Sequence, residues 1–237
     1  MSHCRDDARD WLGQARVDDG VRALRPDYTA LLIVAEGLSP GPSDDATDSL
    51  LCEAEDGARV VLAGREPAEL PQVADWRAAY QAFGAKPSRT RPSVEALLRR
   101  LGAGLPRIDR ITDVYNAVSV RHLVPAGGED LDRYEGPIRL VRATGGEPFD
   151  TIREGQPEIV HPAPGEVVWR DDAGVTCRCW NWRQCTRTRV SDATVRAVFV
   201  LDGLAALGDT QLQAAGDDLM ATLAALHPGA RFAARVV

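Results

Sequence analysis

The stretch Ile111-Thr-Asp-Val-Tyr-Asn-Ala-Val-Ser-Val-Arg-His122 decides the fold expected for the middle of this chain. Four of its apolar residues recur at helical spacing and share one face: Ile111, Val114, Tyr115 and Val118. This pattern predicts a helix over residues 111–122 with that face in the core. Thr112, Asn116 and Ser119 form an adjoining polar stripe. Such a stripe can line a cleft or form a solvated flank, and both interpretations stay open.

Outward from this helix, the sequence predicts three more. Periodic apolar residues indicate a helix over residues 73–84, where Gly84 offers a C-terminal stop. A second runs over residues 93–102, with a proline just before it. The last is an amphipathic helix over residues 210–226.

Short apolar or alternating runs predict strands between and around these helices. They cover residues 29–35, 58–62, 137–142, 166–170, 175–180 and 195–201. Asp171-Asp-Ala-Gly174 separates two of the runs and is a hairpin turn signal. Because strands and helices follow one another without a repeat or a linker, we expect a single α+β domain.

Composition excludes several classes of protein. The 237 residues are 44% hydrophobic and 27% charged, which are ordinary values for a globular protein, so a disordered, collagenous or coiled-coil chain is excluded. The net charge is −7, and Lys86 is the single lysine among 28 basic residues. This balance argues against DNA binding or any other polyanion binding over the whole surface.

The basic residues are unevenly distributed along the chain. Residues 76–110 carry eight basic residues against two acids, and residues 177–196 carry five against one, which leaves −17 on the rest. Two basic segments in an acidic body indicate a localised anionic ligand, provided that folding brings them to one face. The alternative is that the arginines are scattered over the surface.

The common signatures of metal, cofactor and histidine chemistry are missing. Cys177 and Cys179 are separated by one residue, whereas structural zinc sites use longer gaps in a turn, so we expect no metal. No nucleotide-binding glycine motif or nucleophile elbow occurs, and we expect no cofactor. His122 falls on the apolar side of its helix and is expected to pack or cap rather than act as a general base.

The chain opens with a charged segment and has no long apolar run. Its longest apolar run is far shorter than the ~20 residues that span a bilayer, and no leader pattern precedes it. The sequence therefore predicts no membrane segment and a cytoplasmic location.

The most unusual local sequence is Cys179-Trp-Asn-Trp-Arg-Gln-Cys-Thr-Arg-Thr-Arg189. Its two tryptophans, two amides and three arginines combine stacking faces, hydrogen-bonding groups and phosphate-binding groups. The alternative is a structural tryptophan cluster that closes a hairpin.

Several motifs in the same order resemble the stand-alone B3/B4 domain proteins, relatives of the editing domain of the phenylalanyl-tRNA synthetase β subunit. They include Trp76-Arg-x-x-Tyr-x-x-Phe-Gly-x-Lys-Pro-Ser88, Ile108-x-x-Ile-x-Asp-x-Tyr-Asn-x-x-Ser119 and Pro125-x-Gly-Gly-x-Asp-Leu-Asp132. The resemblance runs from about residue 76 to residue 201. It implies an α+β fold with a mixed sheet or β-sandwich and flanking helices.

The resemblance also implies a function, which is trans-editing. Such a protein captures a mischarged aminoacyl-tRNA by its acceptor end and hydrolyses the ester bond, without a metal, a cofactor or a covalent nucleophile. Asn116 and Ser119 carry over as catalytic residues. The implied substrate-binding residues are Thr112, Trp180, Asn181, Trp182, Arg183 and Gln184, and the implied tRNA-binding residues are Lys86, Arg89 and Arg91.

The chain departs from the synthetase pattern at two positions. The synthetase's pocket histidine falls on Gly127, and its glutamate falls near Thr186, which implies another amino acid or a binder that no longer cleaves. Two other functions stay open: a non-catalytic module that binds tRNA or an amino acid, and a small-molecule hydrolase or amino-acid sensor without an RNA role.

The same resemblance divides the chain into three parts. We expect residues 1–70 to form an acidic segment integrated into the fold, residues 71–205 to form the B3/B4-like core, and residues 206–237 to add a C-terminal helix and tail.

Overall fold

A four-stranded antiparallel sheet, in the order β11-β2-β10-β3, forms the centre of the computed structural model, which describes residues 3–237. Its middle strands are β2 (Thr29–Glu36) and β10 (Arg196–Gly203), and its edges are β3 (Ala126–Asp130) and β11 (Arg231–Val236). The apolar run in β2 is buried on both sides, which explains why it lacks the alternation of a half-exposed strand.

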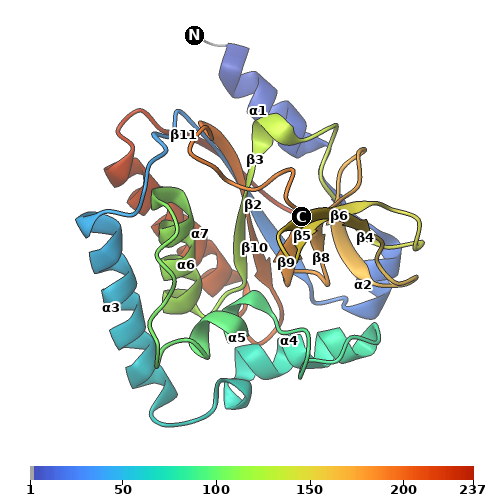
Figure 1. The fold of residues 1–237 in the computed structure, drawn as a ribbon, viewed down its shortest axis with the longest axis horizontal. Helices are drawn as coiled ribbons and strands as arrows, with labels where there is room; N and C mark the ends of the chain where they lie inside the picture. Colours follow the sequence, from blue (N-terminus) through green and yellow to red (C-terminus); the bar gives the residue numbers. More distant parts are fainter. Residues whose placement is uncertain (1–2) are drawn as a thin grey trace.

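Helices α6 (Arg110–His122) and α7 (Asp209–Leu226) cover one face of this sheet, and α3 (Asp45–Leu62) packs on the outer side of α6 (Figure 1). Leu31 and Ile33 of β2 point toward this layer and share a core with Val114 and Val118 of α6. The quoted helix therefore packs its apolar face on the central sheet, as its periodicity predicts.

The other face of the central sheet packs against a second sheet, in the order β1-β4-β7-β8-β9. Its strands are β1 (Arg16–Val17), β4 (Arg139–Arg142), β7 (Val167–Arg170), β8 (Val175–Arg178) and β9 (Arg183–Gln184). Leu32 and Val34 of β2 share this second core with Leu140 and Trp169. A separate hairpin consists of β5 (Phe149–Arg153) and β6 (Gln156–Val160).

The remaining elements close the ends of the two sheets. They are α1 (His3–Gly13), α2 (Asp19–Leu24), α4 (Pro71–Ala82), α5 (Ser93–Leu98) and the short 3-10 helices η1 (Pro67–Glu69) and η2 (Leu131–Arg133). In Figure 1, α4 and α5 run below the sheets, and α1 lies at the opposite end. The predicted α+β class is confirmed.

Most of the predicted elements are present, but one strand is wrong. Residues 58–62 are the last turns of α3 rather than a strand. Leu51, Ala54 and Ala58 recur at helical spacing on the buried side of this helix, and Asp44 caps its start by accepting hydrogen bonds from the backbone N–H groups of Ala46 and Thr47. The N-terminal cap and this period outweigh the β-propensity of Val60 and Val61.

Two further expectations need correction. The helix predicted over residues 93–102 ends at Leu98 and continues as turns. His122 neither packs in the core nor caps its helix, because its Nε2 atom lies 2.8 Å from Asp218 Oδ2 on α7. Edge strand β11, which follows the last helix and pairs with β2, was not predicted from the sequence.

In residues 3–237, none of the helices combines the length and the apolar composition that crossing a membrane requires.

Candidate functional site

A cavity of about 310 Å³ lies beside the central sheet, between helices α5 and α6 and the turn that joins β8 to β9. Helix α6 contributes Thr112, Tyr115 and Asn116 to its wall, and the β8–β9 region contributes residues 180–184. Because these segments lie more than sixty residues apart in the sequence, the cavity exists only when the two sheets and the helix layer have assembled.

Seven of the sequence-predicted site residues line this cavity together: Thr112, Asn116, Trp180, Asn181, Trp182, Arg183 and Gln184. The polar stripe on α6 is therefore not a solvated flank: Thr112 and Asn116 face the cavity. Their chemical roles remain predictions.

Ser119 does not line the cavity. Its side chain is fully buried, and its hydroxyl donates a 2.6 Å hydrogen bond to the carbonyl oxygen of Val124, just beyond the end of α6. Leu123 between them adopts a positive φ of 55°, the left-handed conformation that often ends a helix. Ser119 therefore stabilises the C-terminal turn of α6, and this placement does not support its predicted catalytic role.

Asn116 has an unusual environment for a buried amide. It is 7% exposed, lines the cavity, and its side chain makes no hydrogen bond to any residue in the part of the chain that the structure describes. Buried amides normally find partners, because an unpaired one costs about 1–3 kcal/mol. The carbonyl and amino groups of Asn116 are therefore available to a bound molecule.

A strained turn carries the other amide, Asn181, into the cavity. Cys179 and Trp180 adopt positive φ angles of 46° and 67°, a conformation that costs a residue with a side chain about 1–2 kcal/mol. Two consecutive left-handed residues form a tight connection between β8 and β9, like a hairpin turn of the primed type. Strain of this kind is concentrated at functional sites.

Trp180 and Trp182 have different environments, although they are two residues apart. Trp180 is fully buried, with ring centroids 5.0 Å from Tyr28 and 5.3 Å from Trp76 in edge-on contacts. This matches the structural tryptophan cluster weighed as the alternative. Trp182 is half-buried, and the guanidinium of Arg183 lies 5.0 Å from its ring centre.

A buried carboxyl group, Asp202, lies in the cavity wall at the end of β10. It accepts hydrogen bonds from the Tyr28 hydroxyl at 2.5 Å and from the Asn181 amide at 3.2 Å, and Asn181 in turn accepts one from Tyr80 at 2.9 Å. Burial raises the pKa of Asp202 to about 7, although these hydrogen bonds oppose the shift.

A second buried carboxyl group, Glu129, lies in the cavity wall on β3. Its Oε2 atom accepts hydrogen bonds from the hydroxyls of Tyr134 and Thr188, both at 2.7 Å. Burial raises its pKa to about 7 as well, against the lowering effect of the Thr188, Tyr134 and Thr176 hydroxyls. Carboxyl groups with such pKa values can bind a cation or exchange a proton with a ligand near neutral pH.

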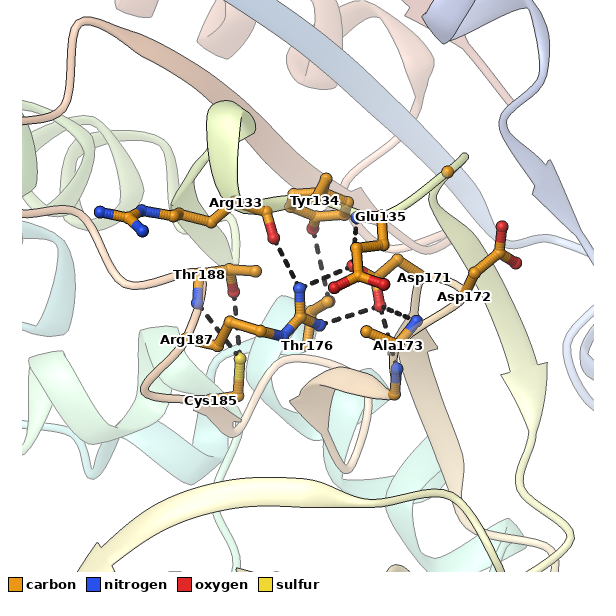
Figure 2. Close-up of polar contacts among 12 residues, drawn as sticks. Arg133, Tyr134, Glu135, Asp171, Asp172, Ala173, Thr176, Cys185, Arg187 and Thr188 are labelled. Atoms are coloured by element: carbon orange, nitrogen blue, oxygen red, sulfur yellow. Dashed lines mark hydrogen bonds and ion pairs between the residues drawn. The ribbon is translucent and has the colours of Figure 1, made fainter.

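An ion pair between Arg187 and Asp171 holds the residues that donate hydrogen bonds to Glu129. Figure 2 shows Arg187 bridging Asp171 and the backbone carbonyl of Arg133, next to Tyr134 and Thr188. Asp171 is fully buried, and besides two hydrogen bonds from Arg187 it accepts three from backbone N–H groups, those of Glu135, Ala173 and Gly174. The Asp171–Arg187 pair therefore positions both neighbours of Glu129.

Glu129 and Asp202 were not predicted from the sequence as site residues. The sequence did contain a signal for a buried acid at each position. Glu129 directly follows Gly127-Gly128, and Asp202 directly follows the apolar run of residues 197–201. Carboxylates are rarely fully buried unless they are paired or functional.

Two glycines make room in the cavity wall. A Cβ atom on Gly127 would lie 2.8 Å from Gln184 Nε2, and one on Gly128 would lie 2.9 Å from the rings of both Tyr115 and Phe199. Gln184 uses this room to donate a 3.0 Å hydrogen bond to the carbonyl oxygen of Gly128. The space beside Gly127 thus holds a side chain supplied from β9.

Ion pairs inside the fold engage five of the eight basic residues of the first segment, Arg77, Arg91, Arg99, Arg107 and Arg110. Glu95 is fully buried and is surrounded by three guanidinium groups, those of Arg77, Arg91 and Arg99, at 2.8, 3.9 and 2.9 Å. Arg107 pairs with Glu55. The second segment behaves similarly, with the ion pairs Arg178–Glu166, Arg187–Asp171 and Arg196–Glu36.

The predicted tRNA-binding residues lie on the loop after α4, outside the cavity. Lys86 and Arg89 are exposed and form no ion pair within residues 3–237, whereas Arg91 is oriented toward Glu95. Arg100, which was not singled out from the sequence, is exposed, lines the cavity and likewise lacks an acidic partner in the described chain. Arg100 and Arg183 are thus the arginines of the cavity wall.

The cysteines give no sign of a metal centre. Within residues 3–237 no group of three or more histidine, cysteine or acidic side chains is arranged to hold a metal ion. Burial raises the pKa of the Cys177, Cys179 and Cys185 thiols, which disfavours the thiolate form that ligates metals.

The fold and the cavity define an α+β domain with a polar site where the two sheets meet helices α5 and α6. A family model described as "B3/4 domain" matches residues 75–211, more than half of the sequence. The chain therefore belongs to the B3/4 domain family.

Comparison with solved structures and with curated proteins adds little to this assignment. The chain is similar to an N-terminal fragment of the phenylalanyl-tRNA synthetase β subunit from Pyrococcus horikoshii, with 13% identity and a TM-score of 0.48. The match covers 92% of this chain and 49% of that one, so the chain spans about half the length of that fragment. No curated protein matches the chain.

Proposed function

We propose that the protein is an aminoacyl-tRNA deacylase that hydrolyses the ester bond of a mischarged tRNA in trans. The observation that carries this proposal is the cavity of about 310 Å³ that an unpartnered amide, Asn116, lines together with the amides of Asn181 and Gln184 in a B3/4 domain. Such a volume is at the lower end of small-molecule sites and accommodates an aminoacyl group.

The chemistry needs little more than fixed polar groups. The ester that links an amino acid to a tRNA is already activated, so a site that orients water and stabilises the developing oxyanion can cleave it without a covalent intermediate. The Asn116 side-chain amide donates to the ester carbonyl oxygen, and its lack of a protein partner means that no bond has to be broken first. The vicinal hydroxyl of the terminal ribose assists the departing oxygen.

The acceptor end of the tRNA approaches over the rim of the cavity. Arg100 and Arg183 lie in the cavity wall, and Lys86 and Arg89 lie on the loop between α4 and α5. None of the four has an acidic partner among the described residues. These few cations contact phosphates locally, while the acidic remainder of the surface repels the body of the tRNA. Binding is therefore weak and short-lived, which lets correctly charged tRNA leave.

Deacylation of a panel of mischarged tRNAs tests the proposal. We expect cleavage of at least one substrate by the wild type and a loss of about 10²–10³-fold in rate for Asn116→Ala, the loss that follows removal of one oxyanion-stabilising donor. Gln213→Ala, an exposed amide on α7 bonded to Asp217, is the control and should keep the full rate. Absence of cleavage at enzyme concentrations equal to that of the tRNA would exclude the deacylase.

The proposed phosphate-binding residues at the rim, Lys86, Arg89, Arg100 and Arg183, can be tested separately from ester hydrolysis. Charge reversal at Arg89 or Arg100 should weaken tRNA binding and flatten its dependence on salt, because fewer counterions are released on binding. Arg153→Glu, on the β5–β6 hairpin, is the matched control because this arginine is 73% exposed. Equal effects of all three substitutions would show that the rim makes no specific contact.

A second candidate is a non-catalytic module that binds an amino acid, favoured by the neutralisation of most of the basic segments. It predicts binding of free amino acid derivatives in the cavity without cleavage of any tRNA ester.

A further inference from the structure

Glu129 and Asp202 mark two ends of the same wall of the cavity. Strands β3 and β10 are antiparallel neighbours, with Glu129 opposite Val198 and Gly127 opposite Val200, and the Asp202 N–H donates to the carbonyl oxygen of Pro125. The two acids therefore lie four residues apart along the sheet, about 13 Å at the backbone, and face the same side. The lining of the cavity therefore includes two carboxyl groups that come from well-separated positions on one sheet face.

Neither carboxyl group has a cationic partner in the part of the chain that the structure describes. Glu129 accepts from hydroxyls, and Asp202 accepts from a hydroxyl and an amide. Other acids buried in this protein, such as Glu95, Glu166 and Asp171, each pair with an arginine. A buried carboxylate without a counter-charge is costly, so a cation on a ligand would relieve that cost.

Between the two acids the cavity has apolar lining residues beside the Gln184 amide that covers Gly127. Val200 lies opposite Gly127, and Leu97 and Trp169 also line the cavity. A methylene chain with a polar group at each end matches this order, because its stem buries apolar surface while its ends meet the carboxyl groups.

A third polar group provides independent evidence of a ligand. The Asn116 amide is 7% exposed, lines the same cavity and has no hydrogen-bond partner among residues 3–237. A bound molecule therefore has to supply a group that hydrogen-bonds to an amide as well as groups that neutralise two acids. An α-amino acid esterified at its carboxyl group has a carbonyl oxygen beside an ammonium group and so meets both requirements at once.

We propose that the cavity recognises an α-amino acid whose side chain ends in a cation, with the α-ammonium at one of Glu129 and Asp202 and the side-chain cation at the other. This inference rests on the proposed function, because it names the acyl group of the substrate. It assigns to the two acids the selection of the substrate and to Asn116 the carbonyl oxygen.

Binding of paired amino acid amides to the full chain tests the inference without any hydrolysis. The probes are L-lysinamide against L-norleucinamide and L-argininamide against L-citrullinamide, since each pair shares the α-ammonium and differs in the side-chain charge. Calorimetric titration at pH 7.5 should give at least a tenfold lower Kd for the charged member of at least one pair.

The variants Glu129→Gln and Asp202→Asn identify the recognising groups. One of them should reduce the charged-to-neutral preference to below threefold, and the other should weaken all four amides by a similar factor. Asp130→Asn is the matched control: this buried acid is next to Glu129 on β3, bonds to Thr194 and does not line the cavity. Its preference should stay tenfold. Thermal unfolding confirms that each variant is folded.

The outcomes separate this inference from the deacylase. Equal affinity for charged and neutral amides, or a preference that survives both substitutions, would overturn the inference even if tRNA esters were cleaved. A charge preference that depends on Glu129 or Asp202, with no cleavage of any ester, would support the recognition and overturn the deacylase.

Discussion

Two groups of buried acids in this protein have opposite environments. Glu95 and Asp171 lie outside the cavity wall. Three arginines surround Glu95, and the guanidinium of Arg187 donates hydrogen bonds of 2.8 and 2.9 Å to the Asp171 carboxylate. Glu129 and Asp202 lie in the cavity wall and receive only neutral donors. The chain has 27 arginines, so the missing partners do not reflect a shortage of cations.

This difference teaches how to distinguish a structural buried acid from one kept for a ligand. An acid that ties elements together is neutralised within the fold, since leaving it unpaired would cost several kcal/mol. An acid that stays unpaired, lines a cavity and has a raised pKa retains its binding capacity for another molecule. The predictions that follow contrast the two groups.

Removing a paired acid should have the largest effect. Asp171→Ala deletes five hydrogen bonds and leaves Arg187 without its partner, so we expect the free energy of unfolding to fall by about 3–5 kcal/mol. Asp202→Asn, which keeps the shape of a cavity acid, should cost far less at pH 7. Urea unfolding of the two variants measures the contrast, and equal losses would contradict it.

The pH dependence of stability should reveal the cavity acids. Both have a pKa raised from below 5 to about 7, so in acid they are protonated in the folded and unfolded states alike. As pH rises from about 4 to 7, only the unfolded state loses these protons, and the free energy of unfolding falls by at most about 3 kcal/mol for Glu129 and about 4 kcal/mol for Asp202. Above pH 7 the loss is complete.

The double variant Glu129→Gln, Asp202→Asn isolates this contribution. Acids with a lowered pKa, such as Asp27 and Glu166, act in the opposite direction but are common to both proteins. The wild type minus variant difference should therefore decline between pH 4 and 7 and then become constant. A difference that does not change with pH would mean that both carboxyl groups titrate normally.

Filling the wall beside Glu129 should have a smaller effect. In Gly128→Ala the new methyl group would lie 2.9 Å from ring carbons of Tyr115 and Phe199, and overpacking of this kind costs about 1–3 kcal/mol. Gly57→Ala in α3 is the control, because nothing lies within 4 Å of its added Cβ. Thermal unfolding should show a lower Tm for the first variant and an equal or higher Tm for the second.

The smallest effect should come from relaxing the turn that carries Asn181. Both Cys177 and Cys179 are buried, so replacing either by glycine deletes a core side chain. Cys179 adopts a φ of 46°, which glycine tolerates without steric cost, so Cys179→Gly should cost about 1 kcal/mol less than Cys177→Gly in the neighbouring regular strand. Equal losses in the two variants would show that the turn is not strained.

Local sequence patterns predicted most of the helices and strands of this fold, but they did not predict contacts between residues that are distant in the sequence. The period of residues 111–122 and the apolar run of β2 each require burial, and both elements are present. The strand expected over residues 58–62 was wrong because a capped helix with its own apolar period had already begun at Asp45.

The candidate site was predictable only in part, for a related reason. The amides of Asn116 and Asn181 are identifiable from their local sequence, and folding brings them into one cavity. Ser119 belongs to the same polar stripe of α6 as Asn116, but its hydroxyl donates a hydrogen bond to the Val124 carbonyl oxygen just beyond the end of the helix. Other contacts, such as Arg178–Glu166 and Arg196–Glu36, join residues 12 and 160 positions apart in the sequence, which no local pattern reveals.

The most direct test of the central claim is a carbon-13 NMR titration of the Glu129 and Asp202 carboxyl groups, with and without L-lysinamide. If the cavity acids are kept unpaired for a cationic ligand, both carboxyl groups should titrate near pH 7 in the free protein, and saturating lysinamide should lower both pKa values. Titration near pH 4 in the free protein, or pKa values that lysinamide leaves unchanged, would contradict the claim.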